Sequence, residues 1–333
     1  MREEEIRPAD IFDEYLRLAA QDTVRYFDAV PRATAPCPAC GSAGEAAFSK
    51  HGFDYQSCPA CATLFVNPRP EAAAFARYYT ESPSAKFWAT TFYKETAATR
   101  REKLWNPKAH LIEEALLRYG AANHHLVDIG GGYGLFAEAM RELCSREITV
   151  IEPSPYLAEV CRGKRLLVIE KFLEDVRLLD LTRGPKAFVS FELFEHLHDP
   201  AAFVRHLSSL MEPGDLLLMT TLSGTGADIQ ALWQDSKAVS PPHHLNFFNP
   251  WSIRILLQRL GMEVLEVTTP GKLDVDILIS NRHLIKDRFW RTFAGAADQA
   301  TQQRWQNLLA DTGWSSHMMT ICRKPAAACR ATE

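Results

Sequence analysis

The stretch "LVDIGGGYG", residues 126–134, decides the fold of this 333-residue chain. Its apolar start is typical of a buried strand, and the run "YGLFAEAMREL" that overlaps its end is typical of a helix. Between strand and helix lies a D-x-G-x-G-x-G pattern made by Asp128, Gly130, Gly132 and Gly134. Glycines let the backbone turn sharply and approach a ligand closely. The stretch therefore predicts a strand, a ligand-binding loop and a helix in succession.

Strands and helices alternate after this unit. The runs "ITVIEP", "LLVIEK", "AFVSFE", "DLLLMTT" and "MEVLEVTT" read as buried strands separated by helical segments. Such alternation predicts an α/β fold with a mostly parallel, doubly wound sheet. Ligands of these sheets bind at the carboxyl ends of the strands. Glu152 ends the strand after the glycine loop, where an acid can accept hydrogen bonds from both hydroxyls of a ribose.

The loop discriminates between two nucleotide cofactors. The dehydrogenase fingerprint is G-x-G-x-x-G, with a helix N-terminus facing a pyrophosphate. Here the loop is G-x-G-x-G, and Asp128 precedes it by two residues. An acid at that place suits a cationic ligand such as S-adenosylmethionine and would repel a pyrophosphate. A tight structural turn with an incidental acid is the alternative.

The tetrapeptide "CPAC" occurs twice, at residues 37–40 and 58–61. Two C-x2-C pairs separated by seventeen residues match a zinc-site pattern, and four thiolates suit tetrahedral Zn²⁺. Because four sulfurs leave no open coordination position, we expect a structural zinc. Two disulfides or a redox pair are the alternative. The predicted ligands are Cys37, Cys40, Cys58 and Cys61. The scattered cysteines, expected to be reduced and packed like small hydrophobes, are Cys144, Cys161, Cys322 and Cys329.

Charge and hydropathy exclude several classes. The net charge is -4 and the pI about 6.3, which gives no electrostatic footprint for nucleic acid or an acidic membrane. Within residues 34–70 the charges of Lys50 and Arg69 balance those of Glu45 and Asp54, so this segment is a poor phosphate binder. The N-terminus has no apolar core of a signal peptide, and the apolar runs are shorter than a membrane span. We expect a cytoplasmic protein without nucleic-acid or membrane partners.

"LVDIGGGYG", "VIEP" and "FELFEHLHDP" together resemble class I S-adenosylmethionine-dependent methyltransferases, in the branch that includes ubiquinone-pathway O-methyltransferases. The cysteine segment followed by "LFVNPRP" resembles bacterial members that carry an N-terminal zinc ribbon. The resemblance covers approximately residues 34–270 plus the last strand and implies a Rossmann-like methyltransferase sheet. The glycines would lie under the methionine part of the cofactor. The cofactor-binding residues that the resemblance implies are Asp128, Gly130, Gly132, Gly134, Glu152 and Phe191.

We divide the chain into an N-terminal helix (1–33), the zinc ribbon (34–70), a helical cap or linker (71–119) and the methyltransferase domain (120–333). In the cap, Tyr93 and Arg101 are candidates for the cofactor, with Arg101 on its carboxylate through a forked contact. A solvated charged face is the other interpretation of "RREK". An insertion at 270–317 precedes the last strand, and it holds three tryptophans. Three interpretations of this insertion stay open: an extra helical pair packed on the core, a substrate lid, or a homodimer face.

Methyl transfer from a sulfonium depends largely on holding the acceptor atom near the methyl group. A base is needed only where the acceptor loses a proton. After the fourth strand, Glu192, Glu195 and His196 are spaced i, i+3, i+4, which places them on one side of a helical turn. His196 is a candidate base. Glu192 is a further catalytic candidate. In the ubiquinone-type branch this motif is associated with a divalent metal, which implies Mg²⁺ on these three residues; packing alone is the alternative.

A second candidate base is His244 in "PPHHLNFFNP". In the resembled family this loop reaches the acceptor pocket, although a histidine can equally pin a loop by hydrogen bonds. The sequence therefore predicts methyl transfer from S-adenosylmethionine to a small-molecule acceptor, a sugar or secondary metabolite, at O, N or C. The alternatives are an RNA or protein methyltransferase that docks its substrate on the ribbon, and a non-catalytic protein that binds S-adenosylmethionine.

Overall fold

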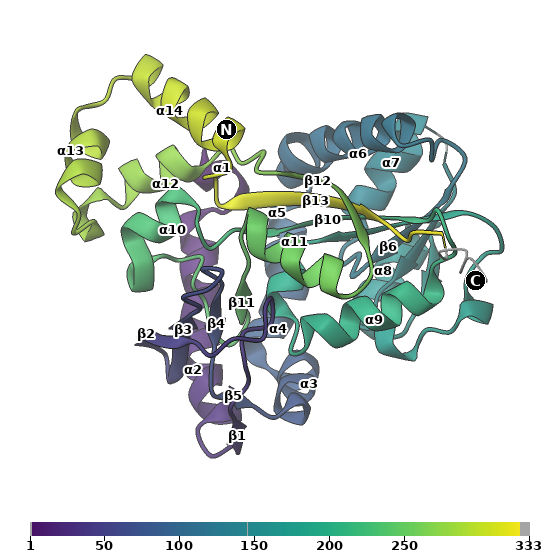
Figure 1. Ribbon diagram of the computed structural model, residues 1–333, viewed down its shortest axis with the longest axis horizontal. Coiled ribbons are helices and arrows are strands. Elements are labelled where there is room, and N and C mark those ends of the chain that lie inside the picture. The colour runs from purple at the N-terminus through teal and green to yellow at the C-terminus, as the bar shows by residue number, and fades with distance from the viewer. Residues whose placement is uncertain (1, 145, 327–333) are drawn as a thin grey trace, which may run out of the picture.

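The computed structural model describes residues 2–144 and 146–326. Its centre is a seven-stranded sheet in the order β12-β13-β10-β9-β6-β7-β8 (Figure 1). Six strands are parallel, and β13 is antiparallel to both of its neighbours. The doubly wound, mostly parallel α/β fold predicted from the sequence is confirmed. The bounds are β6 His125–Ile129, β7 Ile148–Ile151, β8 Leu167–Ile169, β9 Lys186–Phe191, β10 Leu216–Leu222, β12 Glu263–Thr268 and β13 His317–Arg323.

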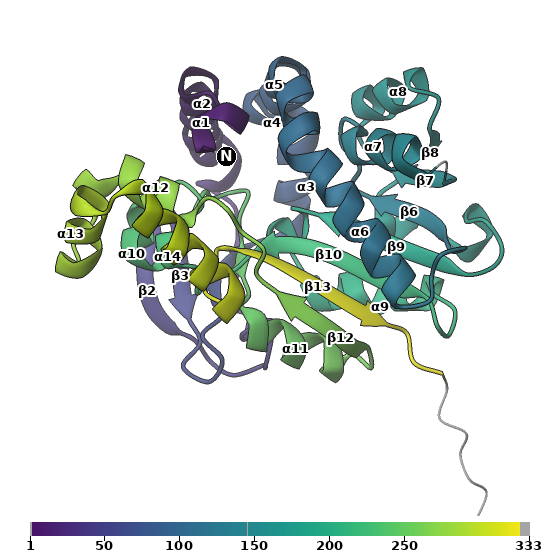
Figure 2. The same cartoon turned by 90° about the horizontal axis from the view of Figure 1, so that it is seen from above.

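Helices cover both faces of the sheet, as Figure 2 shows from above. On one face lie α6 (Asn106–Arg118), α7 (Leu135–Cys144) and α8 (Pro155–Gly163). On the other lie α9 (Pro200–Leu210) and α11 (Pro250–Arg259). Each helix turns an apolar stripe at helical spacing toward the strands. The strands themselves are buried on both sides, which explains their unbroken apolar runs.

The segment before the sheet is helical, as predicted. Helix α2 (Ala9–Phe27) lies within the N-terminal segment 1–33, and its buried aromatic residues pack against α4 (Pro83–Phe87) and η1 (Trp88–Phe92). The segment "ESPS" separates α3 (Ala72–Glu81) from α4, and the Ser82 hydroxyl there accepts a hydrogen bond from the N–H of Ala85. The remaining elements here are α1 Glu3–Ile6, α5 Tyr93–Arg100 and η2 Arg101–Trp105.

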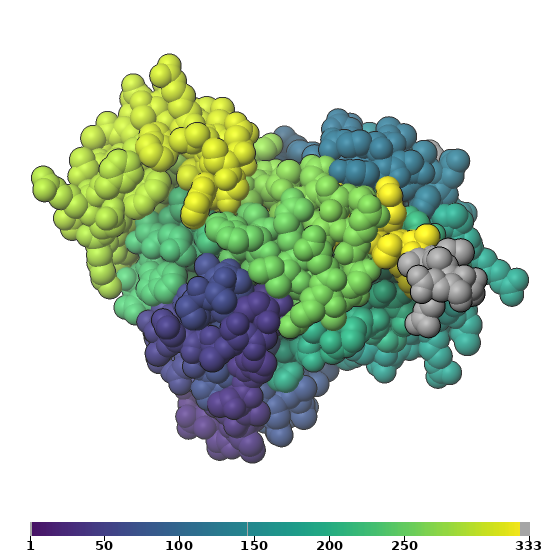
Figure 3. Space-filling view, in the orientation of Figure 1, coloured from purple at the N-terminus to yellow at the C-terminus, as the bar shows by residue number. Residues whose placement is uncertain are grey.

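The cysteine segment forms a small antiparallel sheet whose fourth strand comes from the main domain. Its order is β11-β4-β3-β2. The bounds are β2 Glu45–Lys50, β3 Phe53–Ser57, β4 Leu64–Val66 and β11 Asn246–Phe247. A separate pair joins β1 (Arg32–Ala33) to β5 (Arg69–Pro70). Three of the cysteines lie in the same apolar cluster as residues of α9 and α11, so ribbon and domain share one core. Figure 3 shows the blue ribbon atoms directly against the green atoms of the domain.

The insertion before β13 contains three helices rather than a pair, and they stand at one end of the molecule (Figure 1). Trp290 and Trp305 pack with Phe289 and Phe293 in one aromatic cluster. The bounds are α12 Asp274–Ser280, α13 Arg288–Ala296 and α14 Gln299–Thr312, and α10 (Ala227–Leu232) packs beneath α12. Short 3-10 turns lie at Leu173–Asp175 (η3), Leu178–Asp180 (η4), Phe194–His196 (η5), Trp233–Asp235 (η6) and Arg282–Leu284 (η7). Of the helices in the described ranges, none combines the length and apolarity needed to cross a membrane.

Candidate active site

The glycine loop leaves β6 and enters α7 with several residues in the left-handed region. Gly130, Gly132 and Gly134 have φ of +72°, +55° and +71°, which other residues adopt only at a cost. Space also excludes side chains, because a Cβ at Gly131 would lie 2.4 Å from Cγ1 of Val150. Gly131 occupies an unspecified position of the D-x-G-x-G-x-G pattern, and it is the lack of space that requires glycine there. The loop therefore exposes backbone, not side chains, at the carboxyl edge of the sheet.

Asp128 lies under this loop with only 2% of its surface exposed. Its Oδ2 atom has no hydrogen-bond partner among the described residues. Burial, together with the nearby carboxylate of Glu152, raises the pKa of Asp128 to about 7. An orphaned carboxylate oxygen of this kind is satisfied best by a cationic or hydrogen-bond-donating ligand. This edge of the sheet is thus suited to a nucleoside that carries a cationic amino-acid group.

Glu152 follows β7 and is buried beside the loop. Its Oε2 accepts the N–H of Gly132 at 2.8 Å, and its Oε1 accepts the N–H of Ser154 at 2.9 Å. Burial raises the pKa of Glu152, and these two hydrogen bonds work in the opposite direction. These two bonds hold the carboxylate in a fixed orientation at the end of β7.

The two cap candidates behave differently. The Tyr93 ring lies against the loop, since a Cβ at Gly132 would be 2.9 Å from the Tyr93 hydroxyl. Arg101 instead forms an ion pair with Glu142, two turns along α7 from the glycines. Its neighbour Arg100 is 8% exposed, and its Nε has no hydrogen-bond partner among the described residues. The structure therefore does not bring Arg101 to the loop, and Arg100 is the arginine that turns inward.

A charged cluster lies at the end of β9, next to the loop. Glu192 has a φ of +50°, and its Oε1 accepts hydrogen bonds from the Thr220 hydroxyl at 2.7 Å and from Nζ of Lys108 at 3.3 Å. Nδ1 of His317 lies 3.5 Å from the same oxygen. Burial opposes ionisation, but the charges of His317 and Lys108 and the bond from Thr220 hold the pKa of Glu192 well below its usual range. Nζ of Lys108 lies 4.8 Å from the ring centroid of Phe191, the residue before Glu192.

Glu195 and two histidines form a second group. Ligand atoms of Glu195, His196 and His244 all lie within 4.8 Å of one another. The metal set expected from the sequence, with Glu192 as a member, is corrected by this geometry: His244 takes the place of Glu192. The reason is the backbone, which leaves β9 in a left-handed turn at Glu192 and forms the single 3-10 turn η5 only afterwards. Glu192 therefore lies on Thr220, whereas Glu195 accepts the hydroxyl of the next residue, Thr221.

The two histidines are neutral acceptors. Nδ1 of His244 donates to the Ala238 carbonyl at 2.5 Å, which leaves Nε2 of the neutral ring as an acceptor. Burial lowers the pKa of His244 to about 4. Burial and the charges of His244 and His243 hold the pKa of His196 well below its usual range. Their rings meet edge to face with centroids 4.8 Å apart. Burial and the charge of Glu192 raise the pKa of Glu195 to about 8.

The four predicted zinc ligands converge. The sulfur of Cys37 lies 3.5 Å from that of Cys61, and the sulfur of Cys40 lies 3.5 Å from that of Cys58. Tetrahedral zinc with Zn–S bonds near 2.3 Å requires sulfurs about 3.8 Å apart. All four are free thiols, which excludes two disulfides here. Cys144, Cys161 and Cys322 are also free, and Cys329 lies outside the described residues. The residues fit a tetrahedral metal.

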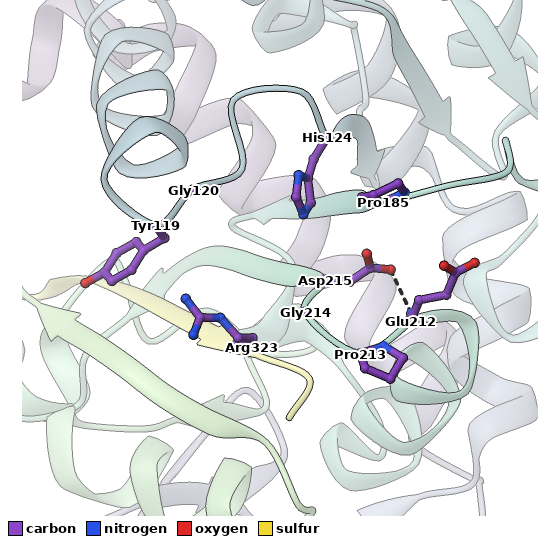
Figure 4. A pocket seen from close by; sticks show the side chains of 9 residues that line it. All are labelled: Tyr119, Gly120, His124, Pro185, Glu212, Pro213, Gly214, Asp215 and Arg323. Atoms are coloured by element: carbon purple, nitrogen blue, oxygen red, sulfur yellow. Dashed lines mark hydrogen bonds between the residues drawn. The ribbon is translucent and has the colours of Figure 1, made fainter. Parts of the chain in front are cut away.

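A cavity also lies at the opposite edge of the sheet. It has a volume of about 380 Å³ and is lined by residues that precede β6, β9 and β10, with Arg323 from the end of β13 (Figure 4). These are the amino ends of the parallel strands. Ligands of doubly wound sheets bind at the opposite, carboxyl edge. This cavity is therefore separate from the glycine loop and the histidines.

Comparison with known proteins agrees with this geometry. Residues 98–267, half of the chain, match a family model described as a methyltransferase domain. The chain belongs to this methyltransferase family. The ubiquinone biosynthesis O-methyltransferase of Xanthomonas axonopodis pv. citri is 26% identical over 47% of this chain and 70% of its own length. That of Xanthomonas campestris pv. campestris, strain B100, is 23% identical over 61% and 88%. The plantazolicin methyltransferase BpumL, solved with a pentazolic analog and S-adenosylhomocysteine, covers 76% of this chain with 12% identity and a TM-score of 0.49.

The methyltransferase is S-adenosylmethionine-dependent, and its active-site edge includes residues that sequence reasoning missed. His317 is the clearest of them. Because β13 runs antiparallel, its first residue lies at the edge where the parallel strands end. The insertion predicted at 270–317 includes His317, so the sequence pattern gave this residue no role at the site. Lys108 gave no signal either, because it lies on a helix whose docking on Glu192 depends on tertiary packing.

Proposed function

We propose that this methyltransferase transfers the methyl group of S-adenosylmethionine to a small-molecule acceptor held over the Glu192–His317 and His196–His244 cluster. The observation that carries the proposal is that the glycine loop contacts the turn after β9. The Leu193 side chain lies against Gly130, because a Cβ at that glycine would be 3.2 Å from Cδ2 of Leu193. The glycine loop and the turn that carries the acids and histidines are therefore in contact. A methyl group held by the loop meets an acceptor on that turn.

The cofactor roles follow from the contacts. Glu152 would hold the ribose, Asp128 would face the cationic amino-acid part, and Tyr93 and Phe191 would flank the cofactor. We assign its carboxylate to Arg100 in place of Arg101, because a buried guanidinium without an anionic partner is what such a carboxylate needs. Arg100→Met should weaken S-adenosylhomocysteine binding at least tenfold, as expected for loss of a hydrogen bond to a charged group. The matched Arg101→Met should leave the affinity within about twofold of the wild type. Equal effects would return the role to Arg101.

Proton removal, where the acceptor requires it, is assigned to the neutral histidines. Nε2 of His244 accepts, because Nδ1 is already committed to Ala238. His196 lies at the fixed end of β9, with Nδ1 3.3 Å from the Tyr79 hydroxyl. A Mg²⁺ bound by Glu195, His196 and His244 is the competing assignment for the same atoms. Chelation that abolishes turnover, restored by Mg²⁺ while the cysteine-bound metal stays in place, would favour the metal.

For the four cysteines we propose zinc in a structural role. Four thiolates close the coordination sphere, so the ion would take no part in methyl transfer. The ribbon is also a poor docking site for RNA, because its two cations are used within the fold. Arg69 is buried, and Nζ of Lys50 donates to the Ser236 carbonyl at 2.9 Å. This favours a small molecule over the RNA alternative.

The test uses a metabolite extract and S-adenosylmethionine carrying an isotope-labelled methyl group, with products followed by mass spectrometry. We expect one or a few metabolites to gain the label with the wild-type enzyme. A His196→Ala/His244→Ala double variant, with unchanged S-adenosylhomocysteine affinity, is the matched control. Labelling of RNA or protein fractions but of no metabolite would reject the small-molecule assignment. Tight cofactor binding without any labelled product would favour the non-catalytic alternative.

A further inference from the structure

The zinc ribbon contacts the candidate site chiefly along residues 243–249. Its β4 strand pairs with β11, with Phe65 opposite Asn246 and Leu64 opposite Phe247. The N–H of Val66 donates to the Leu245 carbonyl at 2.9 Å. The strand that follows His243 and His244 thus belongs to the sheet of the ribbon, and its pairing with β4 sets its backbone position.

Tyr55, in the middle of β3, reaches the histidine itself. Its hydroxyl donates to the backbone carbonyl of His244 at 2.7 Å, and the residue is 1% exposed. Nδ1 of the same histidine is held by the Ala238 carbonyl. With carbonyl and ring both fixed, the direction of Nε2 is determined. Within the described part of the chain, none of the hydrogen bonds or ring contacts of Tyr55 involves the glycine loop.

The other histidine turn is tied to the same sheet. The N–H of Leu245 donates to the Glu195 carbonyl at 2.8 Å. The buried Arg69 guanidinium binds the side-chain oxygen of Asn246 and donates to the His198 carbonyl at 2.5 Å. Asn246 in turn donates from Nδ2 to the Leu197 carbonyl at 2.7 Å. Both turns that bear the candidate bases are therefore hydrogen-bonded to residues of the ribbon or of its fourth strand.

The metal ligands connect directly to this arrangement. Cys61 begins the turn into β4, and its carbonyl accepts a hydrogen bond from Nδ2 of Asn249 at 2.8 Å. Asn249 also caps α11, with its Oδ1 accepting the N–H groups of Trp251 and Ser252. The ribbon thus holds both ends of the segment 245–249, through Val66 at Leu245 and through Cys61 at Asn249. Hydrogen-bonded supports of this kind commonly decide whether a catalytic group is correctly oriented.

We propose that the ribbon is a positioning element for methyl transfer, with Tyr55 as the positioning residue that orients His244. The inference rests on the proposed function, because it assigns the histidines to the acceptor. It gives the zinc ribbon a role in the chemistry without any zinc contact to substrate. It also explains why the ribbon shares a core with the domain and does not stand apart as a docking module.

The test compares Tyr55→Phe with Tyr26→Phe. Tyr26 belongs to the same apolar cluster, and its hydroxyl makes no hydrogen bond among the described residues. For Tyr55→Phe we expect a tenfold or greater fall in the maximal rate of label transfer from S-adenosylmethionine to the metabolite extract. The KM for S-adenosylmethionine, the S-adenosylhomocysteine affinity and the zinc content should be unchanged. Amide hydrogen exchange in residues 243–249 should accelerate. Tyr26→Phe should match the wild type in all of these.

The outcomes separate the two proposals. Unchanged rate and exchange in Tyr55→Phe would overturn the positioning role, whatever the acceptor is. Wild-type enzyme that labels nothing would reject the proposed function, and the exchange result would still judge the link between ribbon and loop. If Tyr55→Phe fails to fold, Asn249→Ser replaces it. Serine keeps the helix cap but removes the amide that reaches Cys61. Faster exchange in 243–249 with zinc retained supports the proposal, and wild-type exchange rejects it.

Discussion

Replacing Asp128 with asparagine should change how the stability of the cofactor-free protein depends on pH. Burial and the carboxylate of Glu152 raise the pKa of Asp128 from its ordinary 3.8 to about 7. The folded state therefore holds this proton more tightly than the unfolded chain does. The stability that the proton contributes is fully present below about pH 3.8 and is lost as the pH rises toward 7. Asparagine has no proton to lose, so the variant lacks this dependence.

The size of the effect follows from the two pKa values. At pH values between these two pKa values, each rise of one pH unit lowers the free energy of unfolding by about 1.4 kcal/mol. From about pH 5 to about pH 7.5 the wild type should lose roughly 2.5 kcal/mol of unfolding free energy relative to Asp128→Asn. Titrating groups that do not interact with Asp128 contribute equally in both proteins and cancel in the difference. A cation bound beside Asp128 should reverse the loss, so S-adenosylhomocysteine binding should release a proton in this range and the variant should release none.

The assay is urea denaturation of both proteins at the two pH values, with the exposed Asp175→Asn as the control. Proton release is measured by titration calorimetry in buffers of different ionisation enthalpy. A difference in unfolding free energy between wild type and Asp128→Asn that stays constant within about 0.5 kcal/mol, the usual limit of additivity, would show that the carboxyl titrates normally. The interpretation of Asp128 as a poised partner for a cationic ligand would then be wrong.

Three further predictions concern other parts of the site. Glu152→Gln should weaken S-adenosylhomocysteine binding by about 1.5–3 kcal/mol, the value of hydrogen bonds to a charged group, as measured by calorimetry; an unchanged affinity would refute the ribose assignment. Cys40→Ser should lower the zinc content below one per chain and destabilise the ribbon, as measured by metal analysis and thermal unfolding, and zinc-free wild type would contradict it. Turnover should be measured for His196→Ala and for His244→Ala. Loss of the histidine that acts as the base should lower turnover about 10²–10⁴-fold with unchanged cofactor affinity. Near-full turnover in both variants would leave positioning of the acceptor as the mechanism.

The parts of the fold that follow from local pattern could be predicted from the sequence. Asp128 and Glu152 were placed correctly at strand ends, because buried strands and the glycine loop have short-range signatures. The grouping of Glu192 with Glu195 and His196 failed, because it assumed a continuous helical turn. A left-handed residue at Glu192 is a tertiary outcome, held by Thr220 and Lys108, and no local propensity indicates it.

The role of the cysteine segment shows the same limit at longer range. Its C-x2-C pairs predict a metal site from spacing alone, because each pair closes a tight turn around the metal. They say nothing about what the ribbon packs against. That is decided by β11, which pairs with β4, the strand that ends at Val66. With only two residues, Asn246 and Phe247, β11 is too short to show any strand periodicity in the sequence. A module that reads as separate in the sequence therefore closes its sheet with a strand from the histidine loop. If β3 and β4 set the position of His244, the ribbon belongs to the active site of the methyltransferase as much as the glycine loop does.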